Sequence, residues 1–387
     1  MTTVSEEQLL EAVKALRITL MTFDEDSANN PKELTTRLKD DHPMWKKGID
    51  VEAVSKALQK IKDAEIPEYV APTELYPLEL LWKGRALLEL NLETLDVVGI
   101  HHAQGGLGSK GSYILACRTS PDSAGESIPG LVVLKESNPS FPAEVFASNV
   151  LRRMSLAAPR FRPLSLKEFQ TFTWKLRSVP VTIPGTCGAL HRSRAQESGG
   201  VLMEFLEGKQ LPECDPKGFT DEKSLRDLGR CMAVDIALNC LDRTPIVWEN
   251  KGNPTNILVS DHGLNIIDNT YNRIGNKELA KKHIDKVRSC AEEAKSGKIG
   301  PHAETVRAFL SSSTDSRVNV SDEQLLKVMN ALHEACEELA ANHAEVFEAA
   351  AKETRQAFEK VKASSKLLLD ECLNLDFCSE CARAMKV

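Results

Sequence analysis

The feature that most constrains the fold is an apolar helix that runs into a loop and then into two short strands. Leu225–Cys240 is apolar on one face, which predicts a helix packed in the core. The runs NILV and LNII follow, separated by Asp-His-Gly, which is typical of a turn. We therefore expect a tight hairpin over Asn256–Ser260 and Leu264–Asp268 directly after the buried helix.

Polar residues stand at the boundaries of these apolar runs. Asp242 follows the helix, Asn256 opens the first strand and Asp268 closes the second. Loops are generally rich in Asp and Asn, but they do not usually place each one at the boundary of a strand. One carboxylate to orient a nucleophile, with an amide and a second carboxylate to bind Mg²⁺, is the set that phosphoryl transfer requires. We predict a catalytic Asp242 and metal ligands at Asn256 and Asp268.

A lysine and a glutamate add to this pattern further upstream. Lys135 closes the apolar run LVVLK, and Glu144 lies in the first turn of a predicted helix over Pro142–Met154. A lysine inside a half-buried sheet needs an anionic partner. We predict that Lys135 holds nucleotide phosphates while Glu144 fixes its ammonium group. A surface lysine and an ordinary first-turn glutamate is the alternative, and the two residues alone do not decide between these interpretations.

A glycine-rich segment, HHAQGGLGSKGS, lies between two predicted strands. Such a hairpin tip lets backbone N–H groups approach phosphates closely. The predicted phosphate-binding positions are Gly105, Gly106, Gly108 and Gly111. The segment is not a Walker loop, because no Gly-Lys-Ser/Thr ending opens a helix. Taken alone, the segment favours a glycine-rich surface hairpin without a ligand.

Three zones are predicted along the chain. Residues 1–92 are helical in pattern, with Asp50 as one helix cap, and 93–210 hold short β-branched runs separated by glycine and proline. Residues 211–387 are again mainly helical, with a capping box at Ser321 and Gln324. Several strands followed by helices favour an α+β fold with an antiparallel sheet.

Composition narrows the function classes. The net charge of −7 argues against a protein that mainly binds nucleic acid. The chain starts without a secretory signal pattern, no apolar run is long enough for a membrane span, and the 10 cysteines are scattered. We therefore expect a cytoplasmic protein with reduced thiols. The CxxC pair Cys378 and Cys381 could be half of a zinc site, but helix packing is the favoured reading because no fourth ligand follows at a suitable spacing.

At these residues the chain resembles a known family. The stretches Asp242-Arg-x-Pro-x-x-Trp248 and Gly252-Asn-Pro-x-Asn-Ile-Leu258 are similar to the catalytic loop of actin-fragmin kinase. Ala143-Glu-Val-Phe-Ala147, Ala158-Pro159 and Met232-Ala-Val-Asp-Ile236 are similar as well, so that the resemblance covers about 90–290. It implies a bilobal protein-kinase-like fold, with a small antiparallel-sheet N-lobe, a mainly helical C-lobe and extra helices before them.

The resemblance also implies an activity. It implies ATP and Mg²⁺ as cofactors and transfer to a Ser or Thr hydroxyl of a protein substrate, with actin or an actin complex as the substrate or partner. It gives Asp242 as base, Lys135 with Glu144 as phosphate anchor, and Asn256 with Asp268 as metal ligands. The stretch Val201–Glu207 would be the hinge for adenine. Its cofactor-binding positions are Glu204, Phe205 and Leu206.

The sequence departs from ordinary protein kinases in several ways. Leu241 stands before Asp242, so that there is no His-Arg-Asp triplet, and Asn269 rather than Phe-Gly follows Asp268. Asp242 and Asn256 are 14 residues apart, whereas an ordinary catalytic loop has about five. A phosphoinositide kinase and a non-catalytic nucleotide-binding scaffold stay open as alternatives. Labelling of lipid rather than protein would favour the first, and ATP binding without turnover would favour the second.

Overall fold

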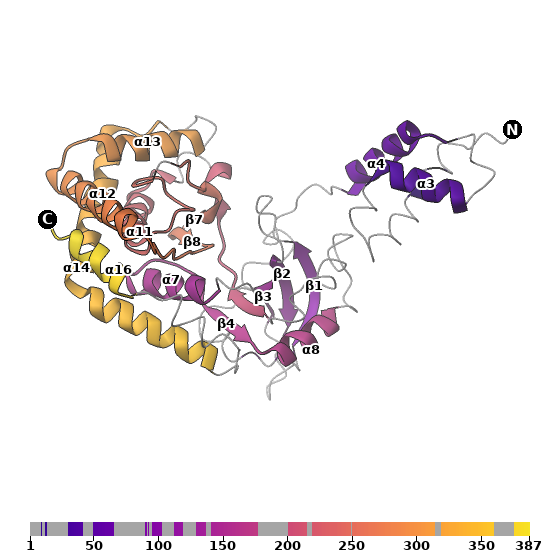
Figure 1. Cartoon of the computed structure of the whole chain (residues 1–387), viewed down its shortest axis with the longest axis horizontal. Coiled ribbons are helices and arrows are strands. Elements are labelled where there is room, and N and C mark those ends of the chain that lie inside the picture. The colour runs from indigo at the N-terminus through magenta and orange to yellow at the C-terminus, as the bar shows by residue number, and fades with distance from the viewer. Residues whose placement is uncertain are drawn as a thin grey trace.

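The computed structural model mixes helices with antiparallel sheets, which confirms the predicted α+β class. The residues that it describes are 9, 12–13, 30–41, 49–65, 90, 92, 95–102, 112–118, 129–136, 141–176, 200–214, 219–248, 250–313, 319–359 and 375–387. In Figure 1 a sheet lies between a large group of helices that includes the C-terminus and two helices near the N-terminus. None of the helices in these ranges is long and apolar enough to cross a membrane.

The larger sheet has five antiparallel strands in the order β1-β2-β3-β5-β4. Their bounds are β1 Asp96–His102, β2 Ser112–Arg118, β3 Pro129–Glu136, β4 Phe161–Leu164 and β5 Gly200–Glu204. Strand β3 is central and pairs with β2 and β5. Lys135 therefore lies opposite Ser112 on one side and Val201 on the other, near the end of the middle strand.

A helix covers each face of this sheet. Successive side chains of a strand point to opposite faces, and both sets are apolar here. Ile114, Val133 and Val201 pack with helix α7 (Phe141–Arg153) in one cluster, whereas Leu115, Leu134 and Leu202 pack with α8 (Leu166–Leu176) in a second. A sheet that is covered on both faces holds Lys135 at a fixed depth.

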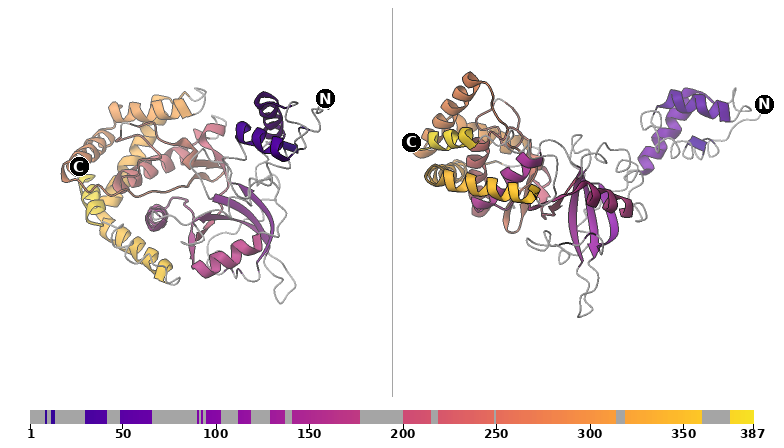
Figure 2. Two further views of the ribbon diagram at one scale, coloured as in Figure 1. Left: turned by 45° about the vertical axis from the view of Figure 1, so that its right-hand side comes forward. Right: turned by 60° about the horizontal axis from the view of Figure 1, so that its bottom comes forward.

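The remaining elements form the helical part and a small sheet. The small sheet is β6 Lys209–Gln210, β7 Ile257–Ser260 and β8 Gly263–Ile266. The helices are α11 Glu222–Leu238, α12 Lys277–Ser296, α13 Pro301–Ser313, α14 Asp322–Glu359 and α16 Leu375–Ala384, with 3₁₀ turns η4 Leu211–Glu213 and η5 Pro254–Asn256. Figure 2 shows this group from two further sides, with α14 as its longest helix.

Helix α11 is the centre of the helical part. Asp221 caps its start by accepting a hydrogen bond from the Ser224 backbone N–H, and Asn239 ends it in the left-handed conformation. Helix α14 crosses it closely at Gly229, because a Cβ there would lie 2.3 Å from the Val328 carbonyl oxygen. The apolar cluster around α11 continues without a break to the α7 face of the large sheet. The site between sheet and helices therefore rests on one continuous core.

The N-terminal helices are α3 Pro31–Asp41 and α4 Val51–Glu65. Their buried residues, which include Leu38 and Leu58, form an apolar cluster of their own, and Figure 1 draws the pair apart from the sheet. The predicted cap at Asp50 is confirmed, since its Oδ1 accepts a hydrogen bond of 2.8 Å from the Ala53 N–H.

Most predicted elements in the described ranges are confirmed within a residue or two. These include the strands at 96–101, 112–118, 131–135 and 201–205, the helix at 142–154 and the hairpin. The Ser321 capping box is confirmed by reciprocal bonds of 3.0 and 3.2 Å with Gln324. Strand β4, helix α8 and strand β6 were missed. The domain boundaries at 92 and 210, and the division into two lobes, stay predictions.

Candidate functional site

The ammonium group of Lys135 is the centre of the site. Its Nζ donates to Glu144 Oε1 on α7 and to Asp268 Oδ1 beyond β8, each at 2.6 Å. The Lys135 and Glu144 side chains are 11% and 9% exposed, whereas that of Asp268 is 51% exposed. The structure thus brings together three residues that the sequence predicted to act together, from a strand, a helix and a strand end. The exposed carboxylate marks the side on which a ligand can approach.

The two carboxylates keep Lys135 charged. Burial by itself lowers the pKa of Lys135, but Glu144 and Asp268 more than offset this and raise the pKa above its ordinary value. Burial raises the pKa of Glu144, and the neighbouring Lys135 limits that rise. A buried lysine that is fixed between two carboxylates is a pre-positioned cation, which suits the binding of phosphate oxygens.

Asp242 and Asn256 lie together although 14 residues separate them. Asn256 is buried in η5, and its Nδ2 donates to the backbone oxygen of Asp242 at 2.9 Å and to Asp242 Oδ2 at 3.3 Å. The Asp242 side chain is exposed. The intervening loop folds back on itself because Asn253 N–H donates to the Arg243 carbonyl at 3.0 Å. Gly252 has a φ of +66° there, and a Cβ on it would lie 2.5 Å from that carbonyl oxygen.

The strand ends bring the chain segments of Asn256 and Asp268 together. The backbone N–H of Ile267 donates to the Asn256 carbonyl at 3.1 Å, which extends the β7–β8 pairing by one step. Asp268 then adopts a φ of +52°, an uncommon left-handed conformation for a residue with a side chain. This turn ends the strand and leads Asn269 back into the protein, where it is buried.

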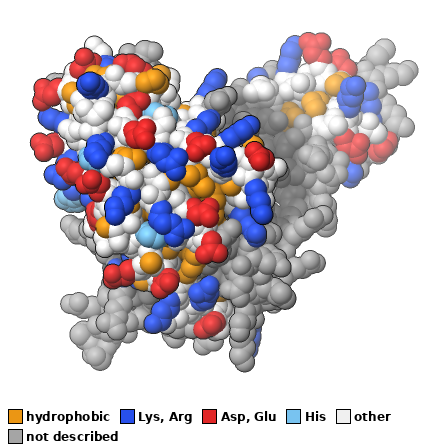
Figure 3. Space-filling model, turned by 60° about the vertical axis from the view of Figure 1, so that its left-hand side comes forward, with side chains coloured by type: hydrophobic (Ala, Val, Ile, Leu, Met, Phe, Trp, Pro, Cys, Tyr) orange, Lys and Arg blue, Asp and Glu red, His pale blue; other side chains and the backbone are white. Residues whose placement is uncertain are grey.

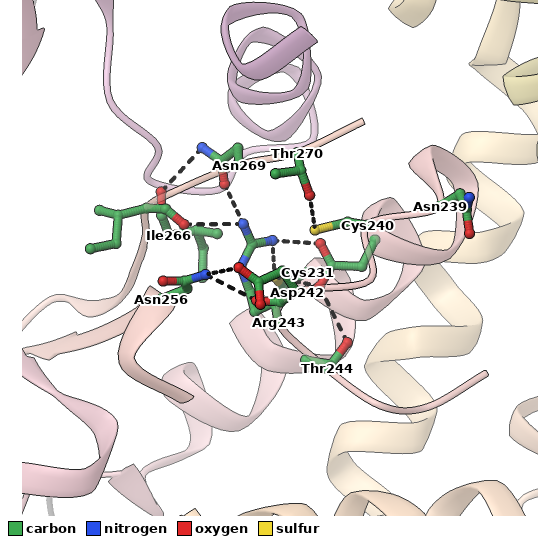
Figure 4. Close-up of polar contacts among 12 residues, drawn as sticks. Cys231, Asn239, Cys240, Asp242, Arg243, Thr244, Asn256, Ile266, Asn269 and Thr270 are labelled. Carbon is green, nitrogen blue, oxygen red and sulfur yellow. Dashed lines mark hydrogen bonds and ion pairs between the residues drawn. The ribbon is translucent and has the colours of Figure 1, made fainter. Parts of the chain in front are cut away.

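A buried arginine organises the loop, and the sequence reasoning missed it. Arg243 is 1% exposed and donates to Asp235 Oδ1 and to Asn269 Oδ1, each at 2.5 Å, and to the Ile267 carbonyl at 3.2 Å. Figure 4 shows Arg243 between the Asp242 loop and the segment around Asn269. Burial raises the pKa of Asp235 to about 6, and the guanidinium limits the rise. Asp235, which lies on α11, is thus a buried partner of Arg243 and Thr244.

The predicted hinge lies wholly within the described residues. Glu204 ends β5, and its Oε2 accepts a hydrogen bond of 3.1 Å from the Arg160 backbone N–H, so that this side chain braces β4. Phe205 packs against the main apolar cluster. Beyond Leu206, the Glu207 carbonyl accepts a bond of 2.6 Å from Asn265 Nδ2 on β8. The segment therefore connects the large sheet to the hairpin that leads to Asp268.

Two further sequence predictions concern the glycine-rich segment and the CxxC pair. Gly105, Gly106, Gly108 and Gly111 fall outside the described residues, so that their predicted role stays a prediction. Cys378 and Cys381 are buried in α16, where burial raises the pKa of both thiols. Within the described ranges, no group of three or more His, Cys, Asp or Glu residues could hold a metal ion. The two cysteines behave as core residues of the helix.

Asn256 and Asp268 nevertheless have the chemistry that Mg²⁺ prefers. Mg²⁺ is usually bound by one or two carboxylates, an amide or water, and substrate phosphates rather than by a dedicated protein cage. The Asp268 carboxylate is half exposed. Both hydrogen bonds of the Asn256 amide use Nδ2, which leaves Oδ1 out of these bonds. The oxygen donors therefore fit a Mg²⁺ ion that is delivered with a nucleotide.

Comparison with known proteins gives a family that agrees with this geometry. The catalytic-domain model of actin-fragmin kinase matches residues 90–345, which is well over half of the chain. A Dictyostelium discoideum protein provisionally named an actin-fragmin kinase is 29% identical over 143 residues, or 35% of this chain and 32% of that protein. The chain thus spans about a third of that relative's length. On the family match, the chain belongs to the actin-fragmin kinase catalytic family, whose name indicates a kinase.

Proposed function

We propose that the chain is an ATP- and Mg²⁺-dependent kinase that transfers the γ-phosphate to a Ser or Thr hydroxyl of a protein. The observation that carries this proposal is the position of Lys135 Nζ, 2.6 Å from both Glu144 and Asp268. A cation held at a buried strand end, beside an exposed carboxylate, is the anchor that nucleotide phosphates require. Transfer of a phosphoryl group depends mainly on such positioning and charge stabilisation.

Each neighbouring residue has a proposed part. Asp268 and Asn256 would hold Mg²⁺, which when bound neutralises negative charge on the phosphate oxygens. Asp242 orients the acceptor hydroxyl and takes its proton late, and Asn256 Nδ2 holds the Asp242 carboxylate through the 3.3 Å contact. The exposure of Asp242 supports this role, because a base must be reached by the acceptor. The backbone of Glu204–Leu206 is the proposed adenine hinge.

The proposed acceptor is actin or a complex that contains it. This part rests on the family name and on the resemblance of the catalytic loop. A lipid head group would need a continuous basic surface near the site. The exposed Lys277, Lys281 and Lys282 of α12 alternate with Glu278 and Asp285. On the face of the molecule that Figure 3 shows, Lys and Arg side chains are interspersed with Asp and Glu. A protein acceptor is therefore favoured over a phosphoinositide.

The test is calorimetric titration with Mg·ATP, followed by a phosphorylation assay with labelled ATP. Lys135→Met should weaken nucleotide binding, and Asp268→Ala should remove the part of the affinity that depends on Mg²⁺. Glu345→Gln, a change to an exposed side chain of α14, serves as control and should bind as wild type does. Unchanged Mg²⁺ dependence in the Asp268 variant would refute the metal assignment.

The acceptor is tested separately with monomeric actin, capped actin, an unrelated protein and phosphoinositide vesicles. Label in actin supports the full proposal. Label in another protein alone removes actin and keeps the protein kinase. Label in the vesicles alone would identify a lipid kinase instead. Nucleotide binding without any transfer would point to a scaffold that lacks turnover.

A further inference from the structure

Helix α7 decides where Glu144 lies, and so how firmly Lys135 is held. All residues of this helix from Phe141 to Leu151 are buried. Its side chains contact the large sheet on one side and the helical part on the other. A buried helix keeps its position only through the elements that pack on it, so that the partners of α7 set the geometry of the Lys135–Glu144 pair.

The distal part of α14, residues 346–359, contacts α7 through a buried hydrogen bond. Asn149 Nδ2 donates to Thr354 Oγ1 at 3.1 Å, and both side chains are buried. The Thr354 hydroxyl donates its own proton to the Ala350 carbonyl at 2.8 Å. The lone pairs of its oxygen can therefore accept the hydrogen bond from Asn149. Loss of this acceptor would leave a buried amide N–H without its partner on α14.

Charged residues add a second contact between the same two helices. Arg152 Nη1 and Arg153 Nη2 of α7 donate to the two carboxylate oxygens of Glu353 on α14, each at 3.3 Å. These side chains are between 25% and 41% exposed, so that water screens the attraction in part. These two ion pairs fix the register of the helices more than they stabilise the fold. Arg152 also donates to Asn149 Oδ1 at 3.2 Å, which joins both contacts.

An aromatic cluster connects these contacts to the catalytic side. The Phe146 ring of α7 lies 6.4 Å from the Phe347 ring of α14. On its other side it meets Tyr271 edge-on, with ring centroids 5.8 Å apart. Tyr271 follows Asp268 by three residues. A single ring, two residues from Glu144, therefore packs against both the distal part of α14 and the segment that follows Asp268.

We propose that the distal part of α14 is a brace that positions Glu144, with Thr354, Glu353 and Phe347 as positioning residues. All three lie beyond residue 345, where the family match ends. Figures 1 and 2 show α14 passing along α7. The inference rests on the proposed function, because it assumes that the Lys135–Glu144 pair anchors nucleotide phosphates. Loosening the brace lets α7 move, so that Lys135 keeps Asp268 but holds Glu144 less firmly.

The test compares Mg·ATP affinity in four single variants of the full chain with that of wild type, at a temperature where circular dichroism shows each of them folded. Thr354→Val keeps the side-chain shape and removes the acceptor for Asn149, and Thr354→Ser restores it. Glu353→Gln removes the charged contact without threatening the core. Ser321→Ala weakens the opposite end of α14 by breaking the capping box with Gln324, far along the helix from Thr354.

We expect Thr354→Val to raise the Kd for Mg·ATP about three- to tenfold, and Glu353→Gln to raise it less. Thr354→Ser should regain most of the affinity. Ser321→Ala should lower the thermal midpoint and leave the Kd unchanged. If Thr354→Val does not fold, Glu353→Gln decides, and an unchanged Kd in that variant refutes the brace.

The two hypotheses fail in different ways. Wild-type protein that does not bind Mg·ATP refutes the proposed function together with the brace. Wild-type protein that binds, with the same Kd in Thr354→Val despite a lower thermal midpoint, refutes the brace alone and assigns Thr354 to stability. A Kd that rises equally in Ser321→Ala would also overturn the brace, because the effect would then follow helix stability and not the contact with α7.

Discussion

Replacing Arg243 with Met should destabilise the protein far more than an ordinary loop substitution. The guanidinium is 1% exposed and bonds Asp235, Asn269 and the Ile267 carbonyl. The nearby carboxylate raises the pKa of Arg243 above its ordinary value even though burial acts in the opposite direction. The folded state therefore favours the charged form of Arg243, and replacing the arginine removes this stabilisation.

The size of the effect follows from what the substitution leaves behind. Met fills much of the space of the Arg stem but leaves the Asp235 carboxylate buried without a cation. Breaking a buried ion pair by removing one partner costs about 3–5 kcal/mol. For a chain of this size, each kcal/mol lowers the thermal midpoint by roughly 2 °C. We therefore expect the midpoint of Arg243→Met to fall by about 6–10 °C.

A second substitution and a pH series test the cause. In wild type, burial raises the pKa of Asp235 to about 6, above the value of about 3.9 in an unfolded chain. Losing the guanidinium raises it further. A carboxyl with a raised folded pKa stabilises the fold below the unfolded pKa, and this contribution is lost as the pH rises through the folded pKa. The loss of stability in Arg243→Met relative to wild type should therefore become smaller as the pH falls from about 8 to about 5.

Thermal denaturation followed by circular dichroism measures these differences. Adding Asp235→Asn to Arg243→Met should recover about 1–3 kcal/mol, because no unpaired carboxylate then stays buried, and should abolish the extra pH dependence. Arg288→Met is the control, because its pair with Asp285 is about half exposed and contributes little. A double variant that is less stable than Arg243→Met by the full cost of Asp235→Asn would refute the reasoning.

Two further outcomes are expected. Asp242→Asn should lower the single-turnover rate about 10²-fold or more while the thermal midpoint and Mg·ATP affinity stay close to wild type, because Asp242 is exposed. A near-normal rate would place the base elsewhere. Burial, more than the nearby Lys286, lowers the pKa of His283, whose Nε2 contacts the Ile236 carbonyl at 3.1 Å. The contribution of His283 to stability should therefore be lost as the pH drops below about 6.5, and a His283→Gln variant should lose less stability than wild type over that range in chemical denaturation.

The sequence predicted the residues that lie at strand ends. Lys135, Asn256 and Asp268 each end or open an apolar run. The end of a strand can be recognised in a sequence as a change from apolar to polar residues. The hairpin turn then fixes which ends lie together. The turn does not fix Lys135, so that its contact with Asp268, 133 residues away in the chain, could not be read from the local pattern.

Burial of a charged residue is not visible in the same way. Arg243 lies in a loop with mostly polar residues, and such a composition predicts that the side chains are exposed to solvent. Its burial depends on Asp235, Ile267 and Asn269, which reach it from two separate segments of the chain. The contacts of α14 with α7 were hidden for the same reason, because Asn149 and Thr354 are 205 residues apart. Strand β4, with four residues and a proline at its third position, offered too short a pattern to detect.

The exposed carboxylates of the site are held by residues that immediately follow them. Asp242 precedes the buried Arg243, and Asp268 precedes the buried Asn269. These two buried side chains bond each other at 2.5 Å. Each exposed carboxylate is therefore one residue away from an anchored neighbour, and the hydrogen bonds of Arg243 to Asn269 and to the Ile267 carbonyl join the two segments. Because the two aspartate side chains are short, a fixed backbone beside each of them leaves few alternative positions for its carboxylate. A site built this way can stay open to a nucleotide and an acceptor while its carboxylates keep their separation.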